Sequence, residues 1–554
     1  MKIRFLLFFM VILPGLKYQI YAQSHFPAYY EITFKDKNQS IYSAQHPETF
    51  LSPNSIARKS KHLIEINQFD FPVNSWYLDS LISRNAKVKY ASRWMNSALL
   101  EITDSLILVE IMKFSFVGGF KYLGPLLILK NEKTLIQETD DEKLITKKQI
   151  QSGFAFQQLE KIGIRPMHEL GFKGDGVMFA IFDAGFSGVD KMEAFEKLFQ
   201  NNKILATYDF AKQKTDVYAD NTHGTSCLST IAGYLPGKFL GSAPEAMFYL
   251  FRTELAASEY PVEEYYWLIA AETADSLGVQ VISSSLGYNM FDDASLNYSQ
   301  QQLDGKTSLI SRAAKMAADK GMLLINSAGN DGQNSWRKIS FPADVEDVIT
   351  VGAINQEGDY AAFSSVGNTA DGRIKPDLVC VGQNTVLINT QDEIFKGNGT
   401  SFAAPTLAGG VALLVQSCPS NTPSEIRNAL LKTASHYISP DSITGFGVPN
   451  IFLAYLYLNG HKIPELSSDE AFQILPNPFE DEVFVYFSSS STKSLNCNIF
   501  NTNGKKVRAF KNLNPVIGNN IFCLSGLHSM KAGVYVITLS DDEKIYTRKI
   551  VKAE

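Results

Sequence analysis

Between residues 150 and 458 the chain alternates short apolar runs with segments of helical periodicity, and this alternation restricts the fold more than any other feature. The apolar runs are Val177–Phe182, Val279–Ser284, Met322–Ser327 and Val348–Val351. The helical segments are Thr222–Tyr234, Glu264–Leu277, Ser308–Lys320 and Ser401–Gln416. Short apolar strands that are separated by helices pair in parallel, and the helices cover both faces of the sheet. We therefore expect an α/β fold built on a helix-flanked parallel sheet.

The regions on either side of this segment have different patterns. Residues 23–148 mix strand-like runs such as Tyr29–Phe34 with helical segments such as Ser75–Asn85, which predicts a small α+β domain. Residues 474–554 show short alternating runs and a turn signal at Asn503-Gly504, which predicts an antiparallel β-sandwich. The expected divisions are therefore 1–22, 23–148, 149–458, a linker at 459–473, and 474–554.

The N-terminus has the layout of a secretory signal. Lys2 and Arg4 precede the apolar run Phe5–Leu13, and Ala22 offers a small residue for cleavage. The run is too short to span a bilayer, and no later segment is long and apolar enough, so we expect export without a membrane anchor. A buried N-terminal strand is the alternative. A charged stretch at 138–148 predicts an exposed linker that a protease could cut.

Charge and cysteine content exclude several classes of function. The net charge of −6 provides neither a basic stripe for nucleic acid nor a polybasic patch for anionic membranes. No CxxC motif is present, so a zinc site of that kind is not supported. Cys497 and Cys523 share one segment and could pair, whereas Cys227, Cys380 and Cys418 read as buried small hydrophobes.

Four short contexts place polar side chains where serine-based acyl transfer would need them. Asp183 ends an apolar strand, and His223 opens a helical segment between small residues. Ser401 follows a Gly-rich loop at a helix start, and Asn330 follows a strand and a glycine. Peptide hydrolysis by a serine needs a base, a carboxylate that orients it, and donors to the oxyanion. For each residue alone, a turn, cap or structural role is the alternative.

Together these contexts resemble the subtilisin-like (S8) serine peptidases over roughly residues 150–458. The family's three catalytic motifs match Ala180-Ile181-Phe182-Asp183-Ala184-Gly185, His223-Gly224-Thr225 and Gly399-Thr400-Ser401-Phe402-Ala403-Ala404-Pro405. The order Asp, His, Ser is the order of subtilisins and differs from those of chymotrypsin and the α/β-hydrolases. The resemblance implies that Asp183 orients the base, His223 is the general base and Ser401 is the nucleophile.

Two further motifs extend the resemblance to substrate binding. Ser285-Leu286-Gly287 resembles the strand that pairs with the substrate backbone, and Ala328-Gly329-Asn330 resembles the oxyanion motif. The resemblance therefore implies substrate-binding roles for Ser285, Leu286, Gly287 and Gly329, with Asn330 as the side-chain oxyanion donor. It implies a secreted serine endopeptidase that acts on proteins or peptides. An idle binding protein of the same fold and an unrelated hydrolase are the competing hypotheses.

The flanking regions add two resemblances of their own. Residues 23–148 weakly resemble the family's propeptides, which assist folding and block the active site; a permanent accessory domain is the alternative. The tail, with Leu475-Pro476-Asn477-Pro478-Phe479 and Gly533-Val534-Tyr535-Val536-Ile537, resembles the type IX secretion sorting domain of Bacteroidetes. This implies export across both membranes with the type IX secretion machinery as partner. A substrate-binding or carbohydrate-binding sandwich is the alternative.

Departures from the family and its cofactors complete the expectations. Cys227 lies close behind His223, where inert burial or sensitivity to heavy metals is expected. Tyr288 stands where many relatives have a second glycine, so we expect it either to narrow the substrate cleft or to give it an aromatic surface. No cofactor or catalytic metal is expected. Calcium is common in the family, but the acidic turn Asp292-Asp293 lacks EF-hand spacing, so a structural ion stays unassigned.

Overall fold

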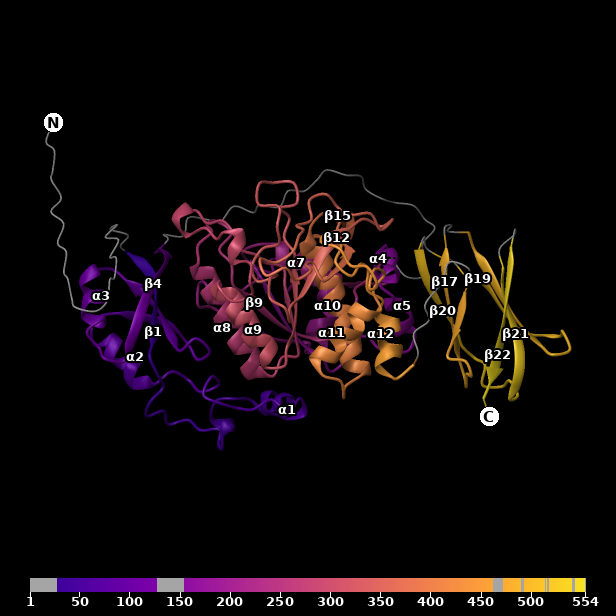
Figure 1. The fold of residues 1–554 in the computed structure, drawn as a ribbon, viewed down its shortest axis with the longest axis horizontal. Helices are drawn as coiled ribbons and strands as arrows, with labels where there is room; N and C mark the ends of the chain where they lie inside the picture. The colour runs from indigo at the N-terminus through magenta and orange to yellow at the C-terminus, as the bar shows by residue number, and fades with distance from the viewer. Residues whose placement is uncertain are drawn as a thin grey trace.

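The computed structural model describes residues 27–126, 154–461, 472–489, 493–513, 515, 518–540 and 544–553. Figure 1 shows these residues as an N-terminal, a central and a C-terminal body in a row. The predicted signal segment at 1–22, the charged stretch at 138–148 and most of the predicted linker at 459–473 lie outside the described residues.

The central body is built on a parallel sheet of seven strands in the order β13-β12-β11-β10-β5-β9-β6. The strands are β5 (Met178–Asp183), β6 (Ile204–Asp209), β9 (Met247–Arg252), β10 (Val281–Ser284), β11 (Leu323–Ser327), β12 (Ile349–Ile354) and β13 (Leu378–Val381). The four predicted apolar runs are β5, β10, β11 and β12. The predicted α/β class with a parallel sheet is therefore confirmed.

Helices cover both faces of this sheet (Figure 1). On β5, Phe179 and Ile181 join a core that includes α7 (His223–Ala232) and α10 (Thr400–Ser417). Phe182, pointing to the other face, joins a core that includes α8 (Val262–Leu277) and α9 (Leu309–Asp319). Because side chains alternate along a strand, a fully apolar strand can fill both cores at once. α11 (Pro423–Lys432) and α12 (Ile451–Leu458) pack in the first core.

Short elements connect these layers. They are α4 (Phe156–Lys161), α5 (Ile164–Glu169), α6 (Glu196–Gln200), β7 (Tyr234–Leu235), β8 (Phe239–Leu240), β14 (Thr385–Ile388), β15 (Ile394–Gly397), and the 3₁₀ turns η2 (Glu193–Phe195), η3 (Ala294–Leu296) and η4 (Gln300–Gln302). None of the helices within the described ranges combines the length and the apolar character that crossing a bilayer requires.

The N-terminal body is an antiparallel sheet in the order β2-β3-β1-β4, with two helices packed beside it. Its elements are β1 (Ala28–Phe34), η1 (Pro47–Thr49), α1 (Pro53–Lys61), α2 (Ser75–Ile82), β2 (Lys87–Ser92), β3 (Ser97–Ile102), α3 (Ser105–Ile111) and β4 (Val117–Pro125). The α+β expectation holds, but sequence reasoning missed α1. That helix reads as polar because it buries Arg58 and Lys59 against the central body rather than an apolar stripe.

The C-terminal body consists of two antiparallel sheets, β16-β17-β20 and β19-β18-β21-β22, that share one apolar core. The strands are β16 (Gln473–Leu475), β17 (Val483–Ser489), β18 (Leu495–Asn501), β19 (Lys506–Leu513), β20 (Gly518–Leu524), β21 (Gly533–Ser540) and β22 (Ile545–Lys552). Cys497 and Cys523 are free thiols on different sheets, so the pairing that the sequence left open does not form.

The C-terminal body packs directly on the central one. The ring of Phe484 on β17 lies 4.2 Å from that of Phe452 on α12, centroid to centroid. The Arg165 guanidinium on α5 donates to the Ile521 carbonyl at 2.7 Å and lies 4.9 Å from the centroid of the Phe522 ring. This sheet is therefore held against the central body by apolar and cation–π contacts.

At Gly241 the chain that follows α7 returns close to the backbone at the end of that helix. A Cβ at Gly241 would overlap the backbone of Ile231 and lie 2.7 Å from the Ala232 nitrogen. Backbone atoms cannot rotate away, so we expect Gly241→Ala to lower the free energy of unfolding by about 1–3 kcal/mol. Urea unfolding measures this, with Gly119→Ala as the control, because a Cβ there would meet only Thr33 Oγ1, at 3.7 Å. Equal midpoints for the two variants would contradict the expectation.

Candidate active site

Asp183 is the last residue of β5, and its carboxylate is fully buried. The Ala184 N–H donates to Asp183 Oδ1 at 2.7 Å, and the Thr253 N–H donates to the Asp183 carbonyl at 3.1 Å. A buried carboxylate is costly unless donors or cations surround it. Its other oxygen, Oδ2, has no partner among the described residues. The Asp183 side chain is therefore fixed by its backbone and by one further donor.

That donor is the imidazole of His223, the first residue of α7. The His223 Nδ1 atom lies 2.8 Å from Asp183 Oδ1. The helix starts at this point because the Asn221 side chain accepts from the His223 N–H at 2.8 Å. Gly224 follows with no room for a side chain, since a Cβ there would lie 2.9 Å from Asp183 Cβ. The hydrogen bond assigns the proton to Nδ1, which leaves Nε2 as the basic nitrogen.

The charge of Asp183 tunes the basicity of this ring. Burial by itself lowers the pKa of His223, because it disfavours the charged imidazolium. The nearby charge and hydrogen bond of Asp183 act in the opposite direction, with a smaller contribution from Cys227, and raise the pKa well above the usual histidine value. The ring is still 32% exposed, so its outer edge can reach a substrate.

Ser401 is the second residue of α10 and is brought close to the histidine helix. Its carbonyl accepts hydrogen bonds from the Ser285 hydroxyl at 2.9 Å and from the Cys227 thiol at 3.2 Å. The ring of the next residue, Phe402, lies 5.9 Å from the His223 ring. The Ser401 hydroxyl donates to the Ser285 carbonyl at 3.5 Å, and no hydrogen bond to His223 is recorded within the described ranges. Such catalytic contacts often tighten only when substrate binds.

Asn330 is oriented by the residue that precedes Ser401. Its Oδ1 atom accepts from both the N–H and the hydroxyl of Thr400, each at 3.0 Å. This fixes the amide so that its NH₂ group is the end left for other partners. The Ser401 N–H lies in the first turn of α10, where helix geometry provides no acceptor. Two donors are thus available near the Ser401 hydroxyl.

The predicted substrate-binding residues lie on the loops that follow β10 and β11. Ser285 and Leu286 are buried, whereas Gly287 is exposed. A Cβ at Gly287 would overlap the Ser340 hydroxyl, and one at Gly329 would lie 3.1 Å from it. Sequence reasoning missed Ser340, which belongs to neither motif and lies far along the chain from Gly287. Its hydroxyl is buried and has no partner among the described residues.

The structure shows where the two residues that depart from the family pattern, Tyr288 and Cys227, lie. The side chain of Tyr288 is buried, and its hydroxyl donates to Glu254, so the expectation that it narrows the cleft is wrong. Cys227 is buried on α7 with its sulfur 3.8 Å from His223 Nδ1. Burial raises the pKa of Cys227, so the thiol stays protonated and acts as a donor to Ser401.

Arg252 is a site residue that no sequence motif indicated. It ends β9 and is fully buried, and its Nε atom donates to the Ala184 carbonyl at 2.8 Å. Its Nη1 atom forms an ion pair with Asp209 at 2.9 Å. Arg252 therefore braces the turn that follows Asp183. The only sequence signal is a charged residue closing the apolar run Met247–Phe251.

Among the residues that the structure describes, two groups of side chains could offer metal ligands. Asp183, His223 and Cys227 form one, and Glu254, Glu259 and Glu263 form the other, with ligand atoms within 4.8 Å of one another in each. The first group is held together by the hydrogen bonds described above. In the second, Glu263 accepts from the Leu255 and Tyr260 N–H groups at 2.7 and 3.3 Å. Protein hydrogen bonds account for part of each group, and we assign no ion to either.

Comparison with known families matches each of the three bodies. The model of the subtilase family matches residues 174–447. The model of the peptidase S8 propeptide domain of Bacteroidota matches residues 29–138, and that of the secretion system C-terminal sorting domain matches residues 473–553. The subtilase match at 174–447 contains Asp183, His223, Asn330 and Ser401.

Individual relatives agree with these matches. Serine protease AprX of Bacillus subtilis (strain 168) is 30% identical over 307 residues, which cover 50% of this chain and 65% of that protein. Subtilisin NAT of Bacillus subtilis subsp. natto is 28% identical over 345 residues, covering 60% of this chain and 81% of that protein. A solved epidermin leader peptide processing serine protease from Staphylococcus aureus covers 78% of this chain and 99% of its own, with a TM-score of 0.54 and 16% identity, which shows similarity of fold alone.

Replacing the buried carboxylate should change the titration of the imidazole. Asp183→Asn removes the charge that raises the pKa of His223 and leaves burial, which lowers it, so we expect that pKa to fall. NMR titration of the histidine Cε1–H resonance measures the change. Asp216→Asn, at an exposed ion pair with Lys214, is the control.

The same substitution should change how stability depends on pH. A raised folded pKa stabilises the protein fully below the usual histidine pKa, and this stabilisation is lost as pH rises through the folded value. The Asp183→Asn protein should lack that component. If the His223 resonance titrates at the same pH in the parent and Asp183→Asn proteins, Asp183 does not raise the pKa of His223.

Proposed function

Because the chain belongs to the subtilisin-like peptidases of the S8 family, we propose that it is a secreted serine endopeptidase that hydrolyses peptide bonds of proteins. The observation that carries this proposal is the Asp183–His223 pair at 2.8 Å, held next to a serine at a helix start.

The proposed reaction uses Ser401 as the nucleophile. Its hydroxyl oxygen attacks the scissile carbonyl carbon, and His223 Nε2 takes the hydroxyl proton. Asp183 holds the ring with Nδ1–H toward itself and stabilises the imidazolium that forms. The imidazolium then gives its proton to the leaving amine, and water hydrolyses the acyl-enzyme by the same route. The Ser285 and Cys227 hydrogen bonds to the Ser401 carbonyl fix the start of α10 during these steps.

The oxyanion is proposed to lie between the Asn330 NH₂ group and the Ser401 N–H. The helix dipole of α10 favours negative charge at this end. Thr400 holds Asn330 Oδ1, so the amide is already oriented before substrate arrives. Donors that need no reorganisation stabilise the transition state more than the ground state.

Substrate is proposed to bind along Ser285–Gly287 and Gly329. The missing side chains of Gly287 and Gly329 let the Ser340 hydroxyl lie against both residues, where a substrate bound along them would meet it. A buried hydroxyl without a protein partner favours a ligand that can hydrogen-bond to it. No cofactor is needed for this chemistry, and a structural calcium ion is left unassigned.

The flanking domains define where and when the enzyme works. The C-terminal sorting domain directs the protein to the cell surface or the medium. We infer that the type IX secretion machinery recognises this domain, and that the N-terminal domain acts as a propeptide that keeps the precursor latent. A substrate-binding role for the C-terminal sandwich is less well supported, because its β17 and β20 face is packed on the central body.

Removing the nucleophile tests the proposed chemistry directly. Ser401→Ala should lower turnover of casein by at least about four orders of magnitude, because attack and proton transfer both depend on the hydroxyl. It should also abolish labelling by a fluorophosphonate, which separates an active peptidase from an idle relative. Ser417→Ala, at the last residue of the same helix, should retain both properties. Casein hydrolysis that survives Ser401→Ala would overturn the proposal.

The oxyanion assignment can be tested separately. Asn330→Ala should lower kcat by about 10²–10³ with KM little changed, because the lost donor acts mainly in the transition state; the magnitude is that known for the corresponding donor in subtilisin. Steady-state kinetics on a peptide amide measures both constants. A loss that appears only in KM would assign Asn330 to substrate binding instead.

A further inference from the structure

A segment of the N-terminal domain leaves its sheet and crosses to the far side of the central body. We call residues 47–70 the arm; it contains η1 and α1. Figure 1 shows α1 well away from the N-terminal sheet, beneath the central body. The Ser52 N–H donates to the Ser276 carbonyl at 3.0 Å, near the end of α8. A Cβ at Gly278 would lie 2.5 Å from Asn54 Cβ, so only glycine admits the arm at that point.

Asp275 on α8 is the centre of the contact. Its carboxylate receives the Arg58 guanidinium in a short ion pair and the Lys59 ammonium at 2.8 Å, both from the arm. Arg93, which follows β2 of the same domain, pairs with its other oxygen at 2.7 Å. Asp275, Lys59, Arg58 and Arg93 are all buried. One carboxylate of the central body therefore forms ion pairs with three cations of the N-terminal domain.

Asp70 forms a second centre of opposite sense. This arm residue pairs with Lys320, which follows α9 of the central body, at 2.7 Å, and with Lys59 at 3.2 Å. Lys37 then ties the end of the arm back to its own domain, donating to the Gln68 carbonyl at 2.7 Å. Across the contact, a carboxylate of the central body pairs with cations of the arm, and a carboxylate of the arm pairs with a cation of the central body. A buried ion that loses its partner is strongly destabilising, so these pairs form or separate together.

The arm and the active site occupy opposite edges of the sheet. Gly278 and Gly321, which contact the arm, precede the strands β10 and β11. Ser285 and Asn330 follow the carboxyl ends of the same two strands. A peptide that enters the catalytic edge therefore does not compete with the arm for its binding surface.

We propose that the arm is a latch that keeps the N-terminal domain bound to the central body after the chain between them has been cut. This inference rests on the proposed function, because it gives the propeptide a second attachment that substrate cannot displace. The attachment lies away from the catalytic edge, and release of the N-terminal fragment is expected to depend on the ion pairs of Asp275 and Lys320.

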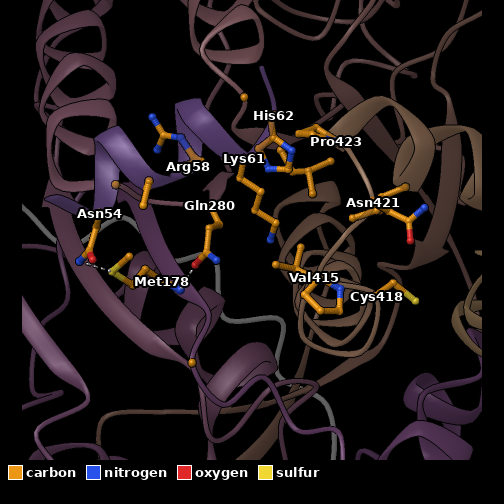
Figure 2. A pocket seen from close by; sticks show the side chains of 17 residues that line it. Asn54, Arg58, Lys61, His62, Met178, Gln280, Val415, Cys418, Asn421 and Pro423 are labelled. Atoms are coloured by element: carbon orange, nitrogen blue, oxygen red, sulfur yellow. Dashed lines mark hydrogen bonds between the residues drawn. The ribbon is translucent and has the colours of Figure 1, made fainter. Parts of the chain in front are cut away.

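A cavity beside the latch identifies a matched control residue. It has a volume of about 280 Å³ and lies between α1 and the segment that joins α10 to α11. Figure 2 shows the Lys61 side chain extending into this space, whereas Arg58 points away from it. Within the described residues no ion pair of Lys61 is recorded. Lys61 thus shares the helix and the charge of Lys59 without its buried contacts.

The test uses the full chain in a Ser401→Ala background, with a cleavage site for a foreign protease placed within 138–148. After cutting, size-exclusion chromatography over time gives the dissociation rate of the N-terminal fragment. Asp275→Asn should raise this rate at least about 30-fold, because three buried cations lose the charge of the carboxylate that they share. Asp319→Asn, at an exposed pair with Lys315 on α9, should stay within about threefold of the parent chain.

A second pair of variants changes only the N-terminal domain. Lys59→Met should accelerate release, whereas Lys61→Met should not, and this pair decides the matter if Asp275→Asn fails to fold. The latch is refuted if the parent fragment leaves as soon as the chain is cut, or if Asp275→Asn and Lys59→Met both release it at the parent rate. Because the readout is dissociation, it does not depend on catalysis. Failure of the proposed peptidase activity would leave these rates unchanged.

Discussion

The structure depends on placing a buried carboxylate at the carboxyl edge of a parallel sheet and giving it one imidazole as partner. The Ala184 N–H and the His223 imidazole both hydrogen-bond to one oxygen of the buried Asp183 carboxylate. The same contact fixes the tautomer of the ring and makes it a stronger base. Adjacent strands then bring Ser285 and the Gly329–Asn330 turn to the same edge, since parallel strands all end on one side.

These side chains can lie close together because two glycines let neighbouring backbone segments approach closely. Gly224 lets α7 lie against the turn after Asp183, and Gly241 lets the chain return against the end of that helix. Arg252, buried beneath the turn, joins the Ala184 carbonyl next to Asp183 to the carboxylate of Asp209. Small residues and one buried ion pair thus place the backbone, and hydrogen bonds such as those of Thr400 to Asn330 orient the side chains.

The two edges of the sheet have separate tasks. The carboxyl edge carries the proposed chemistry, whereas the amino edge receives the arm through Asp275 and Lys320. The two edges are the opposite ends of the same strands. The arm can therefore hold the N-terminal domain without contacting Ser401. The C-terminal domain packs on a third surface, near α5 and α12. The arm, the candidate active site and the C-terminal domain therefore occupy different faces of the central body.

Sequence by itself determined the fold class and the candidate residues Asp183, His223, Asn330 and Ser401, because strand periodicity and short motifs are local properties. It could not find α1, Ser340 or Arg252, since each owes its role to residues distant along the chain. It misjudged Tyr288, whose ring turns inward to Glu254 rather than to the cleft. Only the tertiary structure decided which charges share a buried site, because the free energy of a buried ion is set by neighbours that the fold selects.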